Sequence, residues 1–318
     1  MKNKNLISQK NKEELSNDGW IITRRDFLKI SVLTTAGICT GLSSANASFL
    51  NSQSNLSFGI VTDPHYAEIP DINGKYYSKS LYKMNECVSL MNNKKVDFLI
   101  ELGDFKDLSQ PASEKETINY LKAIEKVFTQ FNGPRYHVMG NHDTDCLSKK
   151  QFLSYIKNTD IPQAKKFYSF ERMGIHFIVL DANYLSDGRD YDHGNWDWTD
   201  ANIPEKEIMW LREDLSSTKK PVIVFAHQLL DGKGSHYVNN AIDVRQELDN
   251  SGKVLAVFQG HYHEGSYSKI NDIHYYTLKA MVTGDGKKNN SYAIVKVYND
   301  HINITGYRKA VDKKCIIR

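Results

Sequence analysis

The stretch VLAVFQGHYHEG, residues 254–265, closes an apolar run with His261 and His263. Residues two apart in an extended chain point to the same side, so both imidazoles face one spot beyond the end of this strand. Four other apolar runs also end in polar clusters, namely TDPHYA at 62–67, ELGDFKD at 101–107, MGNHDTD at 139–145 and FAHQ at 225–228. Sites in open α/β sheets form beyond the carboxyl ends of strands, so the repeated placement predicts one shared site.

Strand and helix patterns alternate along the chain from residue 58 onward. Apolar runs typical of buried strands occupy 58–63, 96–104, 135–143, 175–183, 221–228 and 254–263. Helical spacing predicts helices over 78–93, 113–131 and 204–215, the second with a capping-box-like start and the third with Pro204 as its first residue. Segments 273–282, 291–299 and 301–309 indicate successive strands. The sequence therefore predicts one α/β layered domain with a strand-rich C-terminal part.

The polar clusters together hold side chains of the kinds that bind transition metals. They are Asp63, His65, Asp104, Asp107, Asn141, His142, His227, His261 and His263. This mixed set of oxygen and nitrogen donors suits Mn, Fe or Zn and suits Mg or Ca less. Because there are more donors than one catalytic ion needs, we interpret them as a site for two divalent or trivalent ions that share a bridging carboxylate. For each carboxylate taken alone, capping of the turn after a strand is the alternative.

In their order along the chain, DPH, GDFKD, GNHD, a lone His and GHYH resemble the motif series of calcineurin-like metallophosphoesterases. The resemblance covers about residues 57–265 and implies a two-sheet sandwich flanked by helices, of the α/β/β/α type. It implies that Asp63, His65 and His263 hold the first metal, that Asn141, His227 and His261 hold the second, and that Asp104 bridges the two.

A narrower resemblance concerns the N-terminal part of the domain. The stretch at 58–81, FGIVTDPHYAEIPD followed by YYSKSL, is similar to the subgroup of manganese-dependent ADP-ribose/CDP-alcohol diphosphatases. That subgroup often has Gln where His65 stands. The likeness therefore supports the subgroup's substrate less firmly than it supports membership of the wider family.

The family resemblance also implies a reaction. His142 matches a histidine that donates a proton to the leaving oxygen or hydrogen-bonds the phosphate in the transition state, and Asp107 matches the acid that orients it. The expected activity is hydrolysis of a phosphate ester or phosphoanhydride by metal-activated hydroxide, with diesters, nucleotide-type diphosphates and monoesters as competing substrates. The alternative is a non-catalytic protein that binds metal or a phosphate ligand on the same scaffold, and the intact His142 and Asp107 argue against it.

Two loops beside the expected site carry aromatic and basic side chains. Residues 65–77 contribute Tyr66, and residues 183–204 contribute Arg189, His193, Trp196 and Trp198. Aromatic rings near a phosphate site can stack on a base or sugar, and Arg189 can pair with a second phosphate. The alternative is an aromatic cover that packs on the sheet. A small phosphorylated molecule is the expected substrate.

The N-terminal region resembles a twin-arginine export signal. Arg24 and Arg25 precede a weakly apolar run at 30–42 and a small-x-small pattern that ends at Ala47. We therefore expect the twin-arginine export machinery to carry the protein out and residues 1–47 to be removed. The domain over 48–318 would then lie in the periplasm or outside the cell. An amphipathic helix with a chance arginine pair is the alternative.

Charge and composition exclude several classes of function. The chain has 41 Lys and Arg and 38 Asp and Glu; seven and four of these lie before residue 48, which leaves 34 of each. A neutral domain without a basic block is not expected to bind a nucleic-acid polymer or an anionic membrane. No apolar run is long enough for an ordinary membrane span. Cys87, Cys146 and Cys315 remain after the signal, and the sequence does not choose a disulfide pair among them.

Overall fold

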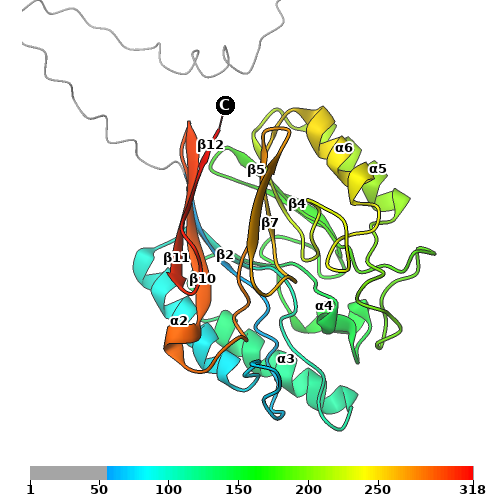
Figure 1. Ribbon diagram of the computed structural model, residues 1–318, viewed down its shortest axis with the longest axis vertical. Coiled ribbons are helices and arrows are strands. Elements are labelled where there is room, and N and C mark those ends of the chain that lie inside the picture. The colour runs from blue at the N-terminus through cyan, green and yellow to red at the C-terminus, as the bar shows by residue number, and fades with distance from the viewer. Residues whose placement is uncertain (1–55, 318) are drawn as a thin grey trace, which may run out of the picture. The chain divides into compact units, whose positions relative to one another are not determined.

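The computed structural model describes residues 56–317, and the expected export signal at 1–47 lies outside this range. Two six-stranded sheets form its centre, with strand orders β12-β11-β10-β1-β2-β3 and β4-β5-β6-β7-β9-β8 (Figure 1). In each sheet the strands beneath the predicted motifs are parallel, so their carboxyl ends lie along one edge.

The first sheet joins three parallel strands to an antiparallel C-terminal half. Its strands are β1 (Leu56–Val61), β2 (Phe98–Glu101), β3 (Arg135–His137), β10 (Ser291–Val297), β11 (His301–Arg308) and β12 (Lys313–Ile316). In this sheet β1 is the junction, because it runs parallel to β2 and antiparallel to β10. Phe58 therefore lies opposite both Phe98 and Val295.

The second sheet has four parallel strands flanked by two antiparallel edge strands. Its strands are β4 (Tyr168–Arg172), β5 (Ile175–Val179), β6 (Val222–Phe225), β7 (Val254–Gln259), β8 (Ser266–Ile270) and β9 (Ile273–Thr277). β5, β6, β7 and β9 are parallel, while β4 and β8 pair antiparallel at the two edges.

Alternate residues of the central strands pack between the two sheets. On β6, Ile223 and Phe225 belong to the inter-sheet core, while Val222 and Val224 face the other side. On β1, Phe58 stacks on Phe98 with ring centroids 4.8 Å apart and also meets rings from the second sheet edge-on. A strand buried on both faces needs apolar residues at every position, which is why these strands are continuous apolar runs in the sequence.

Helices cover the outer face of each sheet (Figure 1). The first sheet is covered by α2 (Lys79–Lys94), α3 (Glu114–Phe128) and α4 (Lys149–Tyr155), and the second by α5 (Glu205–Ser217) and α6 (Ala241–Ser251). Helix α3 begins as expected, because the Ser113 side chain accepts a hydrogen bond from the Glu116 N–H. The predicted sandwich of two sheets flanked by helices is therefore confirmed.

Several short elements differ from the sequence-based expectation. β4, β8, β12, α4 and α6 were not predicted, and Pro204 is the cap of α5 and not its first residue. β8 alternates half-buried and exposed residues, so it lacks the apolar run that marks a central strand. Cys87, Cys146 and Cys315 are free, and among residues 56–317 no helix combines the length and apolar character that a bilayer crossing needs.

Candidate metal centre

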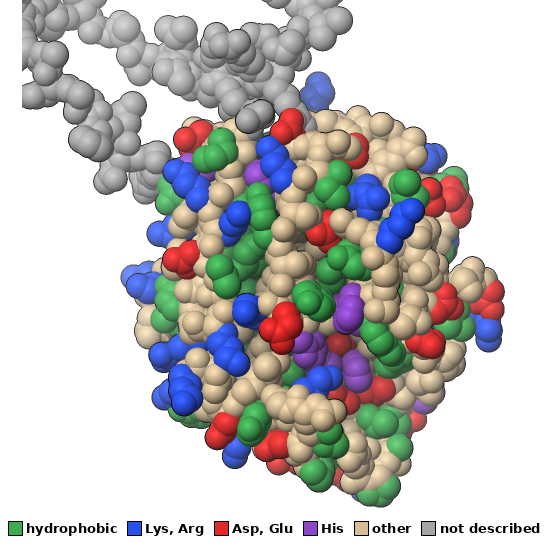
Figure 2. All heavy atoms as spheres, viewed as in Figure 1, with side chains coloured by type: hydrophobic (Ala, Val, Ile, Leu, Met, Phe, Trp, Pro, Cys, Tyr) green, Lys and Arg blue, Asp and Glu red, His purple; other side chains and the backbone are tan. Residues whose placement is uncertain are grey.

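The carboxyl ends of five strands from both sheets meet at one place. Asp63 follows β1, Asp104 follows β2 and Asn141 follows β3, while His227 follows β6 and His261 follows β7. Backbone hydrogen bonds join these strand ends, from Asp63 N to Gly103 O at 3.0 Å and from Gly260 N to His227 O at 3.0 Å. Figure 2 shows histidine side chains gathered beside acidic side chains in a hollow of the surface.

A first group of donors lies around Asp63. Its Oδ1 is 3.3 Å from His263 Nε2 and 3.7 Å from His65 Nε2, and the two imidazole nitrogens are 3.2 Å apart. One ligand atom from each residue lies within 4.8 Å of the others, which is the spacing of a shared cation. The structure therefore brings together the three residues predicted for the first metal.

A second group lies around Asp104. Its Oδ2 is 3.2 Å from His227 Nε2, and His261 completes a trio whose ligand atoms also lie within 4.8 Å of one another. The same Oδ2 is 3.4 Å from His65 Nε2, a member of the first group. Asp104 thus faces both groups with one oxygen, which is an arrangement that suits a bridging carboxylate.

The chemistry of the donor set fits metal ions. Four of its buried polar atoms have no hydrogen-bond partner: Asp63 Oδ1, Asn141 Oδ1, His227 Nε2 and His261 Nε2. Buried polar atoms normally have partners, because leaving one unsatisfied costs about 1–3 kcal/mol. Three of these atoms, on Asp63, His227 and His261, belong to the two donor groups, and cations that they would coordinate explain why they lack partners.

Unusual backbone conformations aim the ligands. Asp63, His65, Asp104 and His261 all have positive φ, between 44° and 64°. Non-glycine residues adopt this region at a cost and accumulate there at functional sites. Glycine is needed where the loops touch, because a Cβ on Gly140 would lie 2.2 Å from Asp104 N and one on Gly260 would lie 2.1 Å from Thr62 Oγ1.

Asp143 holds two of the ligand loops together. Its carboxylate accepts hydrogen bonds from the backbone N–H groups of Asp104, Phe105 and Gly140 at 2.8–3.0 Å. The loop after β2 is thereby tied to the loop after β3. Asp143 therefore fixes the position of Asp104 without itself facing the donor groups.

Nearby charges and burial shift the pKa values of the histidines in this cluster in opposite directions. Burial opposes protonation of His227, but the charge of Asp104 outweighs it and raises the pKa of His227 to about 9. Burial lowers the pKa of His261 to about 3, because no carboxylate compensates for it to the same degree. Burial also opposes ionisation of Asp63, but the adjacent imidazoles of His263 and His65 hold its pKa well below the usual range.

The predicted catalytic pair lies at the edge of the first group. His142 Nδ1 is 3.4 Å from Asp107 Oδ1, and its ring stands edge-on to His65 at 4.7 Å. Asp107 Oδ2 also lies 3.0 Å from His65 Nδ1, so one carboxylate serves a predicted ligand and the predicted acid. Burial opposes protonation of His142, but the charges of Asp107 and Asp104 hold its pKa well above the usual value.

The five residues predicted for substrate binding divide into two sets. Trp196 lies 5.6 Å from the ring of His142, and Trp198 lies 6.0 Å from that of His261. Tyr66 is buried and donates its hydroxyl to Glu68, which fits the alternative of a packed cover. Arg189 is exposed and pairs with Asp187, while His193 pairs with Asp192 and Glu114. A substrate role for these five stays a prediction.

Sequence reasoning missed two residues near the centre. His236 lies in the loop between β6 and α6, and its ring is 5.5 Å from that of His261 and 5.0 Å from that of Trp198. Asp145, at the end of the GNHDTD stretch, faces His142. A histidine in a long polar loop carries no periodic signal, so nothing in the sequence marks His236. Asp145 could have been predicted, because it lies only three residues after His142 in the same motif.

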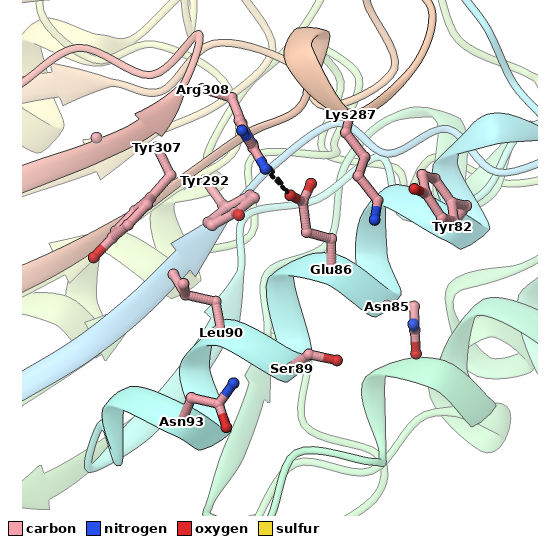
Figure 3. Close-up of a pocket in the computed structure, with 11 residues that line it drawn as sticks. Tyr82, Asn85, Glu86, Ser89, Leu90, Asn93, Lys287, Tyr292, Tyr307 and Arg308 are labelled. Atoms are coloured by element: carbon pink, nitrogen blue, oxygen red, sulfur yellow. Dashed lines mark hydrogen bonds and ion pairs between the residues drawn. The ribbon is translucent and has the colours of Figure 1, made fainter.

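A separate pocket of about 580 Å³ lies between α2 and strands β10 and β11 (Figure 3). Arg308 pairs there with Glu86, and the rings of Tyr292 and Tyr307 stack with centroids 5.4 Å apart. None of the predicted site residues lines this pocket. It therefore does not belong to the metal centre.

Comparisons with known proteins agree with this geometry. The profile of the calcineurin-like phosphoesterase family matches residues 56–265, which include all five motifs. The chain belongs to this family. This metallophosphoesterase is therefore a hydrolase, and its donor set and its relatives support divalent metal ions as cofactors.

Individual relatives differ in the activities that their names state. A manganese-dependent ADP-ribose/CDP-alcohol diphosphatase from Oryza sativa subsp. japonica is 26% identical over 312 residues, covering 80% of this chain and 92% of that protein. The serine/threonine-protein phosphatase CPPED1 from Rattus norvegicus is 25% identical over 247 residues, covering 73% and 75%. A dimetal phosphatase structure from Danio rerio, 18% identical, has a TM-score of 0.73 over 84% of this chain and 100% of that chain, and shows the same fold.

Proposed function

We propose that this metallophosphoesterase holds two divalent metal ions such as Mn²⁺ and hydrolyses small phosphate diesters or nucleotide-type diphosphates. The observation that carries the proposal is the position of Asp104 Oδ2, 3.4 Å from His65 Nε2 in one donor group and 3.2 Å from His227 Nε2 in the other. Asp63, His65 and His263 would hold the first ion, Asn141, His227 and His261 would hold the second, and Asp104 would bridge them. Such ions, when bound, act as Lewis acids towards phosphoryl oxygens and lower the pKa of water.

The chain's own residues supply the remaining functions of the site. His142 is placed to donate a proton or a hydrogen bond at the edge of the first donor group, and Asp107 lies 3.4 Å from its Nδ1. The charges of Asp107 and Asp104 raise the pKa of His142 and so favour the protonated imidazole that a proton donor requires. Positioning and charge stabilisation of this kind dominate phosphoryl transfer.

A preference for substrates with a ring system follows from the rings beside His261. Trp198, His236 and Tyr262 form an aromatic wall, in which Trp198 is 5.0 Å and Tyr262 is 5.1 Å from His236. Trp198 and Tyr262 are exposed, at 40% and 36%, so both side chains are accessible to a ligand. Burial, reinforced by His263, lowers the pKa of His236 and leaves a neutral ring. Neutral aromatic surfaces suit a nucleobase or sugar.

Phosphomonoester hydrolysis is the second candidate, because CPPED1 from Rattus norvegicus is named a protein phosphatase. A substrate panel separates the two. The full chain is loaded with Mn²⁺, its metal content is measured, and turnover of ADP-ribose, a phosphodiester and a phosphoserine peptide is compared. We expect the first two to be hydrolysed faster by kcat/KM. Faster turnover of the phosphopeptide would favour the second candidate, and no metal-dependent turnover would reject both.

We also propose that residues 1–47 direct export by the twin-arginine route. Support comes from the Arg24–Arg25 pair, the weakly apolar run at 30–42 and the small residues up to Ala47. Cell fractionation tests this in a bacterial host with the export route. We expect the wild-type chain in the periplasm or the medium and a variant with both arginines changed to lysine in the cytoplasm. Equal distribution of the two proteins would contradict the proposal.

A further inference from the structure

His142 lies between two carboxylates. Its Nδ1 is 3.4 Å from Asp107 Oδ1 on one side and 3.8 Å from Asp145 Oδ2 on the other. Asp107 comes from the loop after β2, whereas Asp145 follows the short helical turn η2 (His142–Thr144) that begins at His142 itself. The site therefore offers two candidates for the group that orients this imidazole.

Asp107 is already engaged elsewhere. Its Oδ2 lies 3.0 Å from His65 Nδ1, and its Oδ1 accepts the backbone N–H of Leu108 at 2.7 Å. A metal-ligating histidine normally uses its second ring nitrogen to bind such a carboxylate, which fixes the ring on the metal. Asp107 is therefore shared between His65 and His142, and it lies closer to His65 Nδ1, at 3.0 Å, than to His142 Nδ1, at 3.4 Å.

Asp145 is held rigidly by a buried lysine. Lys106 is fully buried, and its Nζ donates to both Asp145 Oδ1 and the backbone carbonyl of His142. The pair neutralises both charges away from water, which is the condition under which buried ions are stable. Because the ammonium binds Oδ1, Oδ2 is the oxygen of Asp145 that is left to face His142.

Two polar atoms between Asp145 and His142 lack partners. His142 Nδ1 and Asp145 Oδ2 are both buried without a hydrogen bond, and they lie 3.8 Å apart. A rotation of the imidazole that closes this gap would satisfy both atoms at once. Trp196 packs edge-on against the ring with centroids 5.6 Å apart and so limits its alternative positions. A hydrogen bond at Nδ1 leaves Nε2 as the nitrogen that faces a reacting group.

We propose that Asp145, held in place by Lys106, is a positioning residue that orients the His142 imidazole for proton donation to the leaving oxygen. The proposal rests on the proposed function, in which His142 acts on the leaving group. In this arrangement Asp107 is shared between the ligand His65 and the acid His142, and Asp145 is a second carboxylate that acts on His142 alone.

The test compares leaving groups that need a proton with leaving groups that do not. Nitrophenolate departs as a stable anion, whereas an alkoxide must be protonated as it leaves. The full chain loaded with Mn²⁺ is assayed as wild type and as Asp145→Asn on a nitrophenyl phosphodiester and on the corresponding alkyl phosphodiester, with metal content measured for each protein. We expect kcat on the alkyl ester to fall by about tenfold or more, with KM and metal content nearly unchanged. On the nitrophenyl ester we expect a change of less than about threefold, because nitrophenolate leaves without needing a proton from His142.

Each outcome decides the proposal. An equal fall on both esters means a general structural role for Asp145 and overturns the proposal, and so does an unchanged rate on the alkyl ester. A wild-type protein that hydrolyses neither these esters nor ADP-ribose rejects the proposed function itself, and this result differs visibly from a failure of the Asp145 variant alone. Glu171→Gln is the control, because it removes an exposed carboxylate that pairs with Lys220 far from the motifs. Its rates should equal those of the wild type.

A second measurement does not depend on activity. The ¹⁵N-histidine spectrum of the metal-free protein reports which ring nitrogen carries the proton, and His142→Ala identifies the His142 resonances. We expect a wild-type His142 Nδ1 resonance typical of a protonated, hydrogen-bonded nitrogen that shifts in Asp145→Asn. Lys106→Met should produce a shift in the same direction. Unmoved His142 resonances in a folded Asp145→Asn protein would overturn the proposal.

Discussion

His227 Nε2 lies 3.2 Å from Asp104 Oδ2, although the two residues follow strands of different sheets. His227 is fixed from behind, because its Nδ1 lies 2.7 Å from the backbone carbonyl of Leu102, just before Asp104. Asp104 is fixed in turn by the N–H of His142, which donates to Oδ1 at 2.8 Å. The centre is therefore a junction between the sheets, and its two donor groups share one carboxylate oxygen.

Replacement of Asp104 should weaken metal binding and slow turnover. Asp104→Asn removes the charge that both donor groups face, so we expect weaker binding of metal and a fall in turnover of about 10²-fold or more. Metal content by mass spectrometry and steady-state kinetics are the measurements. Full activity with normal metal content would contradict the bridging role, and Asp300→Asn, a surface change, serves as the control.

Replacement of His142 should separate chemistry from metal binding. His142→Ala is expected to keep both metals, because His142 is not assigned as a ligand, and to slow turnover by about 10²-fold or more. The same two measurements apply. Loss of metal in this variant would mean that His142 is itself a ligand, as its closeness to His65 and Asp104 would allow.

Metal affinity should rise with pH up to about 9. In the metal-free protein Asp104 raises the pKa of His227 to about 9, so His227 is protonated at neutral pH, whereas a metal ligand must be neutral. Binding therefore releases a proton below pH 9, and this one group strengthens the apparent affinity by up to about tenfold per pH unit. His261, with a pKa of about 3, releases none near neutrality. Calorimetry in buffers of different ionisation enthalpy counts the protons, and an affinity that is flat between pH 6 and 9 would be inconsistent with His227 as a ligand.

Removal of His236 should weaken the binding of substrates that carry a base. Stacking on an aromatic side chain contributes about 1–3 kcal/mol per base, so His236→Ala is expected to raise KM for ADP-ribose by about fivefold or more. A diphosphate without a base is the control substrate, and its KM should not change. A similar rise for both substrates would point to a distorted His261 and not to lost stacking, since the two rings are in contact.

Removal of Phe58 should destabilise the sandwich. Phe58 is fully buried and meets four aromatic rings between the sheets, so Phe58→Ala is expected to lower the free energy of unfolding by about 3–5 kcal/mol. Urea unfolding of the metal-free protein measures the change. Tyr82→Ala, at a ring that is 47% exposed, should change it by less than about 0.5 kcal/mol, and equal losses would show that the inter-sheet core is not where stability resides.

Part of this fold was predictable because its central strands are buried on both faces. β1, β2, β5, β6, β7 and β9 were visible as apolar runs. The edge strands β8 and β12 bury only part of their surface and show no such run, so only pairing with a neighbour makes them strands. The ligand candidates were predictable for a related reason, since each lies just beyond the carboxyl end of a parallel strand.

The sequence by itself determined the layered fold, the five strand-end motifs and the family to which they belong, because burial and strand direction leave a local record in residue order. Only the tertiary structure decided which carboxylate oxygen faces which imidazole, that Lys106 holds Asp145 beside His142, and that His236 lies against His261. These contacts join loops far apart in the chain, and their geometry depends on how the two sheets pack, which no local pattern encodes.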